Sequence, residues 1–263
     1  MKNILVTGAY GGMGRAAVTL LAQSGWRVFA LDQRTDAPAE NVIPIEADIT
    51  EEGSVVHALE AVRMHTSSLD AILHFAGIYM LDSLAEMSAE ALHRIMNVNF
   101  FGAFSVNKVF LPLLSKGARI LITTSELAPL DPLPFTGVYA LTKSTLDKYA
   151  YSLRMELQLL GISVSVLRAG AVDTGMLKDS TDALDRFCES TSLYSCNAAR
   201  LKKIVERVEA RRNPPERLAR RALSILERKN PAFAYSINRN PLLLLLNLLP
   251  KRLQLWAIRL VLR

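Results

Sequence analysis

The sequence predicts an α/β protein built on one doubly wound parallel sheet. Two observations predict it: short apolar runs alternate with longer segments of helical periodicity, and the first run is followed directly by a glycine-rich loop, TGAYGGMG, at residues 7–14. Apolar strands that alternate with helices form parallel sheets whose faces are both covered. With 263 residues, half of them hydrophobic, the chain can also bury one large core.

The expected strands are the short apolar stretches at residues 4–6, 28–31, 42–45, 71–75, 119–123 and 163–167. The expected helices lie between or after them, at residues 13–24, 53–64, 89–114 and 138–160. We find no internal repeat and no low-complexity linker, so we expect one domain over residues 1–237. Residues 171–212 are polar and helical without a clear strand, and in such a sheet they would form a lid beyond the carboxyl ends of the strands, where ligands bind.

Composition narrows the class of protein. Cys188 and Cys196 have no metal-ligand spacing and are expected to be reduced thiols, and four scattered histidines give no metal site. The amino terminus lacks a signal-peptide core, which predicts a cytoplasmic protein. Residues 200–263 carry 16 basic and 4 acidic side chains, which leaves 15 basic and 21 acidic for the rest. This asymmetry indicates either an anionic surface as partner or a solvated helix face of alternating charge; no nucleic acid is expected.

The loop at residues 7–14 has the context of a phosphate site, because a strand precedes it and a helix follows. Gly8 would allow a sharp turn, Gly12 a close approach of the backbone to a pyrophosphate, and Gly14 tight packing of helix on strand. The helix that begins near Met13 would direct free N–H groups and its positive dipole end at the phosphates. The spacing T-G-x-x-x-G-x-G differs from G-x-G-x-x-G, and glycine-rich turns are common, so the loop needs support.

Asp32 supplies part of that support. It ends the second expected strand, 18 residues after Gly14. A carboxylate there can accept hydrogen bonds from the adenosine ribose hydroxyls and would repel a 2′-phosphate. Arg34 could offset that repulsion in part. The sequence therefore favours NAD over NADP.

The segment YALTK, residues 139–143, indicates the chemistry. Tyr139 and Lys143 are four residues apart, so on a helix they share a face and can meet around one ribose. A free phenol has a pKa of about 10 and is a poor base at neutral pH. A neighbouring ammonium and a cationic nicotinamide both favour the phenolate, so Tyr139 could act as general acid and base. By itself such a pair also occurs by chance in many helices.

Two further residues strengthen this interpretation. Ser125 follows the fifth expected strand, 14 residues before Tyr139, where its hydroxyl can bind the reacting oxygen. Asn99, in NVNFFG, lies on the preceding helix. Asparagine is unfavourable in mid-helix, and its side chain can instead hold water or a backbone group.

With these motifs the chain resembles the short-chain dehydrogenase/reductase family over residues 3–237, which implies a Rossmann fold and often a homodimer or homotetramer. The ordered set that carries the resemblance is TGAYGGMG, Asp32, Asp48, HFAG, Asn99, Ser125, YALTK and RAGAVDTGM. The resemblance implies that Ser125 positions the substrate oxygen and Tyr139 transfers its proton. Lys143 would bind the nicotinamide ribose and lower the tyrosine pKa, and Asn99 would support a water that leads from Lys143 to solvent.

The resemblance also assigns cofactor contacts. Asp48 and Ile49 would flank the adenine, and Thr174 would hold the carboxamide. The full set of expected contacts is Gly8, Gly12, Met13, Gly14, Asp32, Gln33, Asp48, Ile49, Phe75, Ala76, Gly77, Tyr139, Lys143, Gly170, Val172 and Thr174.

The chain departs from the family pattern at two places. The family usually has Asn-Asn-Ala-Gly after its fourth strand, whereas this chain has His74-Phe75-Ala76-Gly77. We expect the usual amide hydrogen bonds to be absent or replaced, with His74 a strand-end residue and neither catalyst nor ligand. Arg168-Ala169-Gly170 stands where Pro-Gly is usual, which should loosen the loop beside the nicotinamide.

Residues 238–263 are expected to form an apolar and basic helical extension. Asn240-Pro241 is a good helix start, Leu242–Leu249 is too short to span a bilayer, and Pro250 divides the segment. In its second half Leu253, Trp256, Leu260 and Val261 share one helical face, and Arg252, Arg259 and Arg263 share another. That pattern fits an amphipathic helix on a membrane, and it also fits a helix pair that covers the substrate cleft or forms a subunit contact.

The expected function is NAD(H)-dependent interconversion of a secondary alcohol and a ketone on a bulky apolar substrate, such as a steroid, a retinoid or a fatty compound. One alternative is a non-catalytic nucleotide sensor, against which the intact proton-relay residues argue. Others are an NADPH-dependent carbonyl reductase and, less favoured, a sugar-nucleotide epimerase, whose glycine loop is tighter and whose chain is longer.

Overall fold

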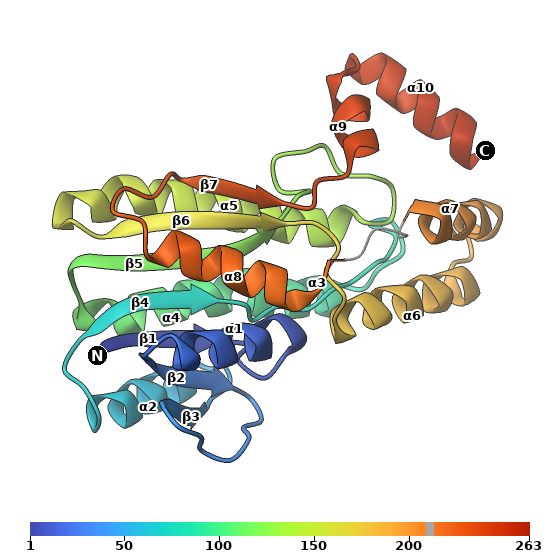
Figure 1. The fold of residues 1–263 in the computed structure, drawn as a ribbon. Helices are drawn as coiled ribbons and strands as arrows, with labels where there is room; N and C mark the ends of the chain where they lie inside the picture. Colours follow the sequence, from blue (N-terminus) through green and yellow to red (C-terminus); the bar gives the residue numbers. More distant parts are fainter. Residues whose placement is uncertain (209–212) are drawn as a thin grey trace.

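Seven parallel strands form one sheet in the order β3-β2-β1-β4-β5-β6-β7 (Figure 1). The computed structural model describes residues 1–208 and 213–263, apart from the side chains of 176–181 and 205–208; the last four residues of the expected lid, 209–212, lie outside the described chain. The strands are β1 (Lys2–Thr7), β2 (Trp26–Asp32), β3 (Val42–Glu46), β4 (Leu69–His74), β5 (Leu114–Ser125), β6 (Ser163–Ala169) and β7 (Ala234–Ile237).

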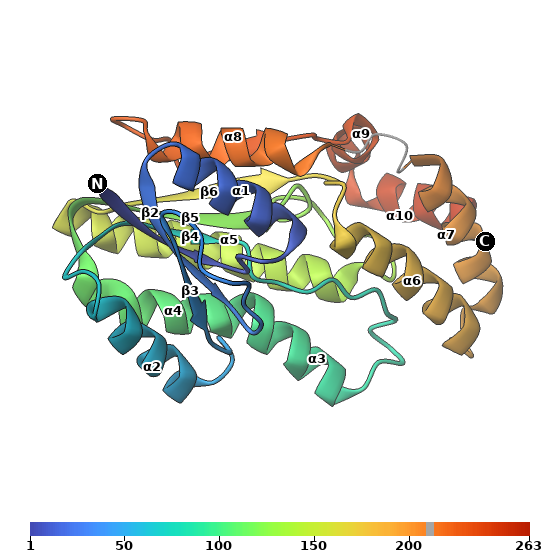
Figure 2. The same ribbon diagram turned by 60° about the horizontal axis from the view of Figure 1, so that its bottom comes forward.

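Helices cover both faces of this sheet (Figure 2). One face carries α1 (Gly12–Gln23) and α8 (Pro215–Leu226), which contact each other. The other carries α2 (Glu52–Arg63), α4 (Gly102–Phe110) and α5 (Gly137–Leu157). Side chains alternate between the two cores because successive residues of a strand point to opposite faces: Ile4 and Val6 pack with α1 and α8, and Leu5 packs with the other helices. The predicted doubly wound α/β fold is confirmed.

The helix expected over residues 89–114 is divided in the structure. It comprises α3 (Ala89–Met96), a single π-helical turn η1 (Asn97–Phe101), α4, and a 3₁₀ turn η2 (Leu111–Leu113), and Leu114 already belongs to β5. A π turn inside a helix is commonly associated with a functional site. Here the turn contains Asn99, whose side chain bonds to backbone groups of another segment. A 3.6-residue periodicity does not reveal such an insertion.

The sequence did not predict the seventh strand. It predicted only that the domain ends at residue 237. β7 has four residues and pairs in parallel with β6 from Val166↔Ala234 to Ala169↔Ile237. It is short and half-buried, so it lacks the continuous apolar run that marks the other strands.

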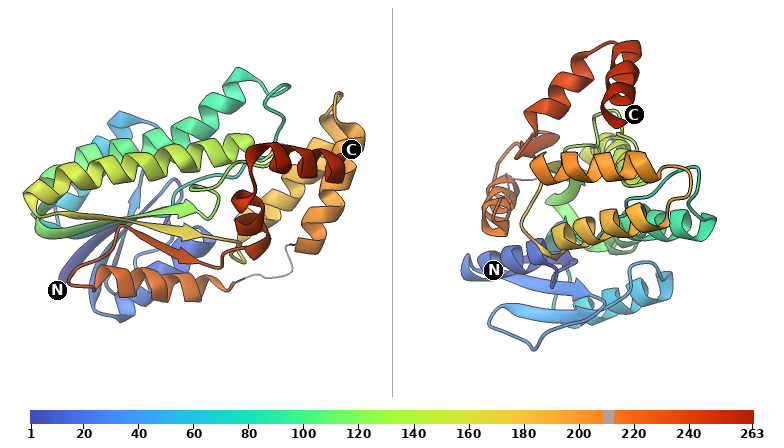
Figure 3. Two further views of the ribbon diagram at one scale, coloured as in Figure 1. Left: turned by 90° about the horizontal axis from the view of Figure 1, so that it is seen from above. Right: turned by 90° about the vertical axis from the view of Figure 1, so that its right-hand side faces the viewer.

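The remaining helices gather beyond the carboxyl ends of the strands, as Figure 1 and the left view of Figure 3 show. α6 (Gly175–Ser190) and α7 (Ser195–Val208) fall in the segment expected to be a lid. α9 (Pro241–Leu248) and α10 (Lys251–Leu262) follow β7, and Pro250 separates them as predicted. Ligands bind in such sheets at the carboxyl ends of the strands, near the point where the strand order reverses, which here lies between β1 and β4.

Candidate active site

The glycine loop is shaped by contacts that leave no room for side chains. Gly8 has a φ of 65°, and a Cβ there would lie 2.5 Å from the Ala76 nitrogen, so the turn after β1 packs directly on the segment after β4. A Cβ on Gly14 would lie 2.0 Å from the Gly8 carbonyl oxygen. The sharp turn expected at Gly8 is present, and Gly14 packs tightly on this turn rather than on the strand. Gly12 faces the side chain of Thr174, where a Cβ would come within 2.7 Å.

The loop opens into a cavity of about 800 Å³ that combines most of the expected cofactor residues. They come from the ends of β1, β2 and β4, from the segment after β3 and from the start of α6. Those that line it are Gly8, Gly12, Met13, Gly14, Asp32, Gln33, Asp48, Ile49, Phe75, Ala76, Gly77 and Thr174. Arg34, which could have offset the repulsion between Asp32 and a 2′-phosphate, is not one of the described residues that line this cavity.

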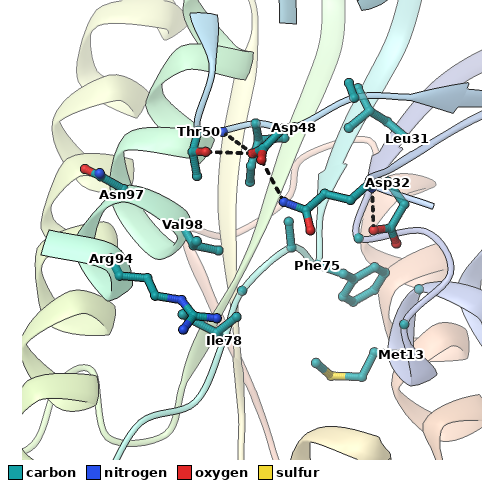
Figure 4. A pocket seen from close by; sticks show the side chains of 18 of the residues that line it. Met13, Leu31, Asp32, Asp48, Thr50, Phe75, Ile78, Arg94, Asn97 and Val98 are labelled. Atoms are coloured by element: carbon teal, nitrogen blue, oxygen red, sulfur yellow. Dashed lines mark hydrogen bonds between the residues drawn. The ribbon is translucent and has the colours of Figure 1, made fainter. Parts of the chain in front are cut away.

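Two carboxylates stand at one end of the cavity (Figure 4). Asp32 accepts hydrogen bonds from the backbone nitrogens of Tyr10, at 2.9 Å, and Gln33, at 2.8 Å. The Gln33 amide donates to Asp48 at 2.9 Å, and Thr50 donates to the other oxygen of Asp48 from both its backbone and its hydroxyl. The Asp48 pKa is lowered, because these hydrogen bonds outweigh the effect of burial. Both groups are therefore fixed in place, and Asp48 is ionised at neutral pH.

Sequence reasoning missed the opposite wall. Glu90, His93, Arg94, Asn97 and Val98 line the cavity from α3 and the π turn. Figure 4 shows the Arg94 side chain extending over the cavity toward Ile78, across from Asp32. In the sequence, the indication that Arg94 belongs to the site is its position one helical turn before Val98 of the NVN motif.

A second cavity of about 750 Å³ adjoins the first, and Met13, Phe75 and Thr174 line both. Of the remaining predicted residues, it contains Ser125, Tyr139, Lys143, Gly170 and Val172. The other residues that line it are mostly apolar, and the sequence analysis did not predict them as site residues. They include Tyr79, Leu81, Leu127, Leu133, Leu184, Leu201, Ile204, Leu242, Leu243 and Leu246.

Ser125, Tyr139 and Lys143 lie together in the wall of the second cavity. Tyr139 is hydrogen-bonded to Ser125, and the Lys143 Nζ lies 5.7 Å from the centroid of the tyrosine ring. Ser125 ends β5, and the other two residues share one face of α5, as predicted. Gly77 borders Lys143 and Asn99, since a Cβ there would lie 3.3 Å from Nζ and 3.2 Å from the Asn99 Oδ1.

The pKa values differ from the expectation drawn from the resemblance. Burial raises the Tyr139 pKa to about 12, and the hydrogen bond with Ser125 offsets this only in part. Burial lowers the Lys143 pKa to about 8. The expected lowering of the tyrosine pKa by Lys143 is thus not achieved by these side chains alone, because desolvation of the phenolate outweighs it.

Asn99 is buried in the π turn and holds a neighbouring chain segment. Its Oδ1 accepts from the Ile78 nitrogen at 2.8 Å, and its Nδ2 donates to the Ile78 oxygen and the Thr142 hydroxyl, both at 3.0 Å. Of the two expected partners, water or a backbone group, the structure shows the backbone of Ile78. The segment after β4 is thereby fixed against α5 beside Lys143.

His74 ends β4 and replaces the usual asparagine contacts with a buried network. Its Nε2 lies 2.9 Å from the Asn107 Oδ1, which can only accept, so Nε2 donates and Nδ1 accepts from the Thr7 hydroxyl at 3.4 Å. Thr7 in turn accepts from the Ala76 nitrogen. Burial lowers the His74 pKa to about 4, so the ring is neutral at physiological pH. The interpretation of His74 as a strand-end residue is consistent with this geometry.

The expected loosening beside Gly170 is wrong. With alanine in place of proline, β6 extends through Ala169, whose oxygen accepts from the Glu126 nitrogen at 2.9 Å, and the Gly170 nitrogen donates to the Ile237 oxygen at 2.9 Å. Arg168 forms two hydrogen bonds with Asp147, at 2.9 and 2.7 Å. The bonds of the Ala169 oxygen and the Gly170 nitrogen, together with the paired Arg168, therefore hold this segment in place.

Comparison with known proteins agrees with this geometry. The sequence pattern described as short chain dehydrogenase matches residues 2–185. A 3-ketodihydrosphingosine reductase of Bacteroides thetaiotaomicron is 27% identical over 234 residues, 88% of this chain and 85% of its own length. Estradiol 17-beta-dehydrogenase 2 of Rattus norvegicus is 30% identical over 199 residues, 70% of this chain but only 52% of its own length. The crystal structure of a short chain dehydrogenase family protein from Francisella tularensis superposes with a TM-score of 0.76 at 24% identity, covering 90% of this chain and 97% of that one.

The chain belongs to the short-chain dehydrogenase/reductase family. It is an oxidoreductase that acts on CH–OH donors with a nicotinamide dinucleotide as acceptor. The first cavity fits such a cofactor: Gly8, Gly12 and Gly14 leave no room for a Cβ, and the amino end of α1 and the two carboxylates lie at its wall.

Proposed function

We propose that the protein interconverts a secondary alcohol and a ketone on a bulky apolar substrate, with NAD(H) as cofactor. The observation that carries this proposal is the position of Ser125, Tyr139 and Lys143 in the wall of a largely apolar cavity that shares lining residues with a cofactor-sized one. Bound in the first cavity, the cofactor supplies or accepts the hydride.

The protein's own groups handle the oxygen and its proton. Ser125, already hydrogen-bonded to Tyr139, orients the substrate oxygen, and Tyr139 gives a proton to it or takes one from it. Lys143 binds the nicotinamide ribose, and its charge together with that of the oxidised nicotinamide ring opposes the effect of burial on the phenol. We assign Asn99 a positioning role, in which it holds Ile78 and leaves Lys143 access to a water that leads to solvent.

The apolar lining of the second cavity supports a lipid-like substrate. Leucines from the loop after β5, from α6, α7 and α9 face it, while most of its polar residues belong to the end of β5, to α5 and to the segment before α9. The relatives named for 3-ketodihydrosphingosine and for estradiol fit the same class. A steroid, a retinoid or a fatty ketone meets these requirements.

The preference for NAD over NADP rests on Asp32. Its carboxylate is fixed at the end of β2 in the first cavity, where it binds ribose hydroxyls and repels a 2′-phosphate. Asp32→Ala should narrow the preference for NADH over NADPH by ten-fold or more, since charge-assisted hydrogen bonds contribute roughly 1.5–3 kcal/mol. A wild-type enzyme that prefers NADPH would contradict the assignment and favour the alternative, an NADPH-dependent carbonyl reductase.

Activity itself is tested by NADH oxidation and NAD reduction against a panel of steroids, retinoids and fatty carbonyl compounds. Tyr139→Phe should lower kcat by about 10² to 10⁴ and leave NADH affinity within a few-fold, because the phenol moves the proton while most cofactor contacts lie elsewhere. A variant that retains more than half of the activity would refute the mechanism.

We further infer a cytoplasmic homodimer or homotetramer. Phe101, Phe104, Tyr151 and Met155 are exposed on η1, α4 and α5, which supports a subunit contact on that face. Sedimentation equilibrium would measure the oligomeric state. The free thiols Cys188 and Cys196 are compatible with a reducing compartment.

A further inference from the structure

The outer side of α9 and α10 exposes a row of large apolar side chains, which we call the tail face. Its members are 50–81% exposed: Leu242, Leu245, Leu248, Leu253, Trp256, Leu260 and Val261. α9 consists almost entirely of leucine, yet none of its residues is buried. Large apolar side chains exposed in such number on two consecutive helices indicate an interaction site.

The tail face is held in a defined position. The Asn247 side chain accepts from the Asp131 nitrogen at 2.7 Å, and Gln254, which is buried, donates to the Leu249 oxygen at 2.9 Å across the bend between the helices. At the far end Asn197 of α7 donates to the Leu262 oxygen at 2.6 Å. Leu262 itself packs on the cluster of α6 and α7. The inner side of the helix pair is therefore anchored, and the apolar residues face outward.

Basic residues border the tail face, and no acidic residue occurs in 241–263. Arg252, Arg259 and Arg263 recur at helical spacing on α10, next to the face formed by Leu253, Trp256 and Leu260. An apolar face with tryptophan beside a basic row is the composition of a helix that lies in a membrane interface.

We propose that the tail face docks on an anionic lipid bilayer. The charges favour this occupant over a second copy of the chain, because a symmetric self-contact brings the same surface of two copies together and would oppose two rows of arginines. No helix among the described residues is long and apolar enough to cross a membrane. The helices would accordingly lie in the interface, with α9 and the apolar face of α10 inserted and the arginines at the lipid headgroups.

The opposite side of α9 forms a wall of the second cavity. Leu243 and Leu246 line that cavity, and Leu242 both lines it and is exposed. Glu126, next to Ser125, fixes the start of α9 by accepting from the Asn240 nitrogen at 2.6 Å. A docked bilayer would thus lie one helix away from the catalytic groups. Resting on the proposed function, this assigns as substrate an apolar alcohol or ketone that resides in the membrane and enters past α9.

Binding is tested by co-sedimentation of the full chain with vesicles of phosphatidylcholine alone or mixed with phosphatidylglycerol. The protein should sediment with the anionic vesicles at low salt and less at high salt. Leu253→Glu/Leu260→Glu should abolish sedimentation, whereas Leu159→Glu, at an exposed leucine on the 3₁₀ turn η3 (Gln158–Leu160), should not change it. Each basic residue near the surface contributes about five-fold in affinity, so R252Q/R259Q/R263Q should bind roughly 100-fold more weakly.

Tryptophan fluorescence reports the orientation, because the chain has two tryptophans in contrasting positions. Trp256 is 62% exposed on the tail face, and Trp26 is 3% exposed in the core. With Trp26→Phe, anionic vesicles should shift the emission of Trp256 to shorter wavelength. With Trp256→Phe, the emission of Trp26 should not respond. A response from Trp26 alone, or no response in either variant, would overturn the proposal.

Further outcomes separate this proposal from the proposed function. If the protein ignores vesicles and Leu253→Glu/Leu260→Glu dissociates an oligomer, the tail face is a subunit contact and the docking proposal is wrong. If docking occurs, turnover of a long-chain ketone carried in vesicles should be faster in anionic than in neutral ones, and that of a water-soluble ketone should be equal in both. Docking without turnover of any alcohol or ketone would refute the proposed function and leave the docking surface standing.

Discussion

Arg168 on β6 holds Asp147 on α5 through two hydrogen bonds, one turn beyond Lys143. Asp147 continues the row that begins with Tyr139 and Lys143, since the three recur every four residues. Thr124, which precedes Ser125 on β5, also donates to Asp147 at 3.3 Å. One buried carboxylate thus connects the strand that carries the serine, the helix that carries the tyrosine and lysine, and the strand beside the second cavity.

Arg168→Met should destabilise the protein by about 3–5 kcal/mol, because it leaves the Asp147 carboxylate buried without its partner. Asp147→Leu/Arg168→Met removes both charges and should recover most of that loss. Urea unfolding of the two variants and the wild type measures the difference. Equal losses in the single and double variants would show that the ion pair is not the cause.

Lys143→Met should abolish turnover and yet stabilise the cofactor-free protein. Burial lowers the Lys143 pKa from 10.5 to about 8, so its charged form costs up to about 3 kcal/mol of folding free energy at neutral pH. Between pH 8 and 10.5 the unfolded chain binds more protons at this group, so the wild-type free energy of unfolding gains a component that rises with pH. The variant should lack that rise, which thermal unfolding of both proteins over a series of pH values measures. A variant that is less stable than the wild type at neutral pH would show that burial of Lys143 carries no such cost.

His74 should make the protein sensitive to mild acid. Its folded pKa of about 4 lies below the ordinary value of 6.5, so the unfolded chain binds more protons between these values and stability falls as the pH drops through that window. This group should make the free energy of unfolding about 2 kcal/mol lower at pH 5 than at pH 7. His74→Asn, which introduces the residue usual in the family, should show a correspondingly smaller loss in urea unfolding at the two pH values.

Arg94→Gln should weaken NADH binding by roughly ten-fold, since a charge-assisted hydrogen bond contributes about 1.5 kcal/mol or more. The guanidinium extends over the first cavity, which a dianionic pyrophosphate would enter. NADH fluorescence titration at low and high salt measures the loss, with Arg63→Gln on α2 as the matched control outside the cavity. An unchanged affinity would place Arg94 outside the cofactor contacts.

The sequence by itself determined the parallel sheet, the glycine loop and the Tyr139–Lys143 face. These depend on periodicities of two and 3.6 residues and on the order of motifs along a strand–helix chain, all of which are local properties. It also fixed the division of the tail at Pro250, because proline has no N–H to continue a helix.

Only the tertiary structure decided which residues from different elements meet. Arg168 pairs with Asp147, and His74 forms a network with Thr7 and Asn107, although these residues belong to segments far apart in the sequence. Arg94 lines the cofactor cavity from the wall opposite the glycine loop. The π turn at Asn99 and the short strand β7 likewise depend on partners outside their own segment. The tail illustrates the same division. Its periodicity predicted two faces, but the packing of α9 and α10 on the rest of the protein determined which side points to the second cavity and which to solvent. Burial depends on neighbouring segments that no local pattern specifies.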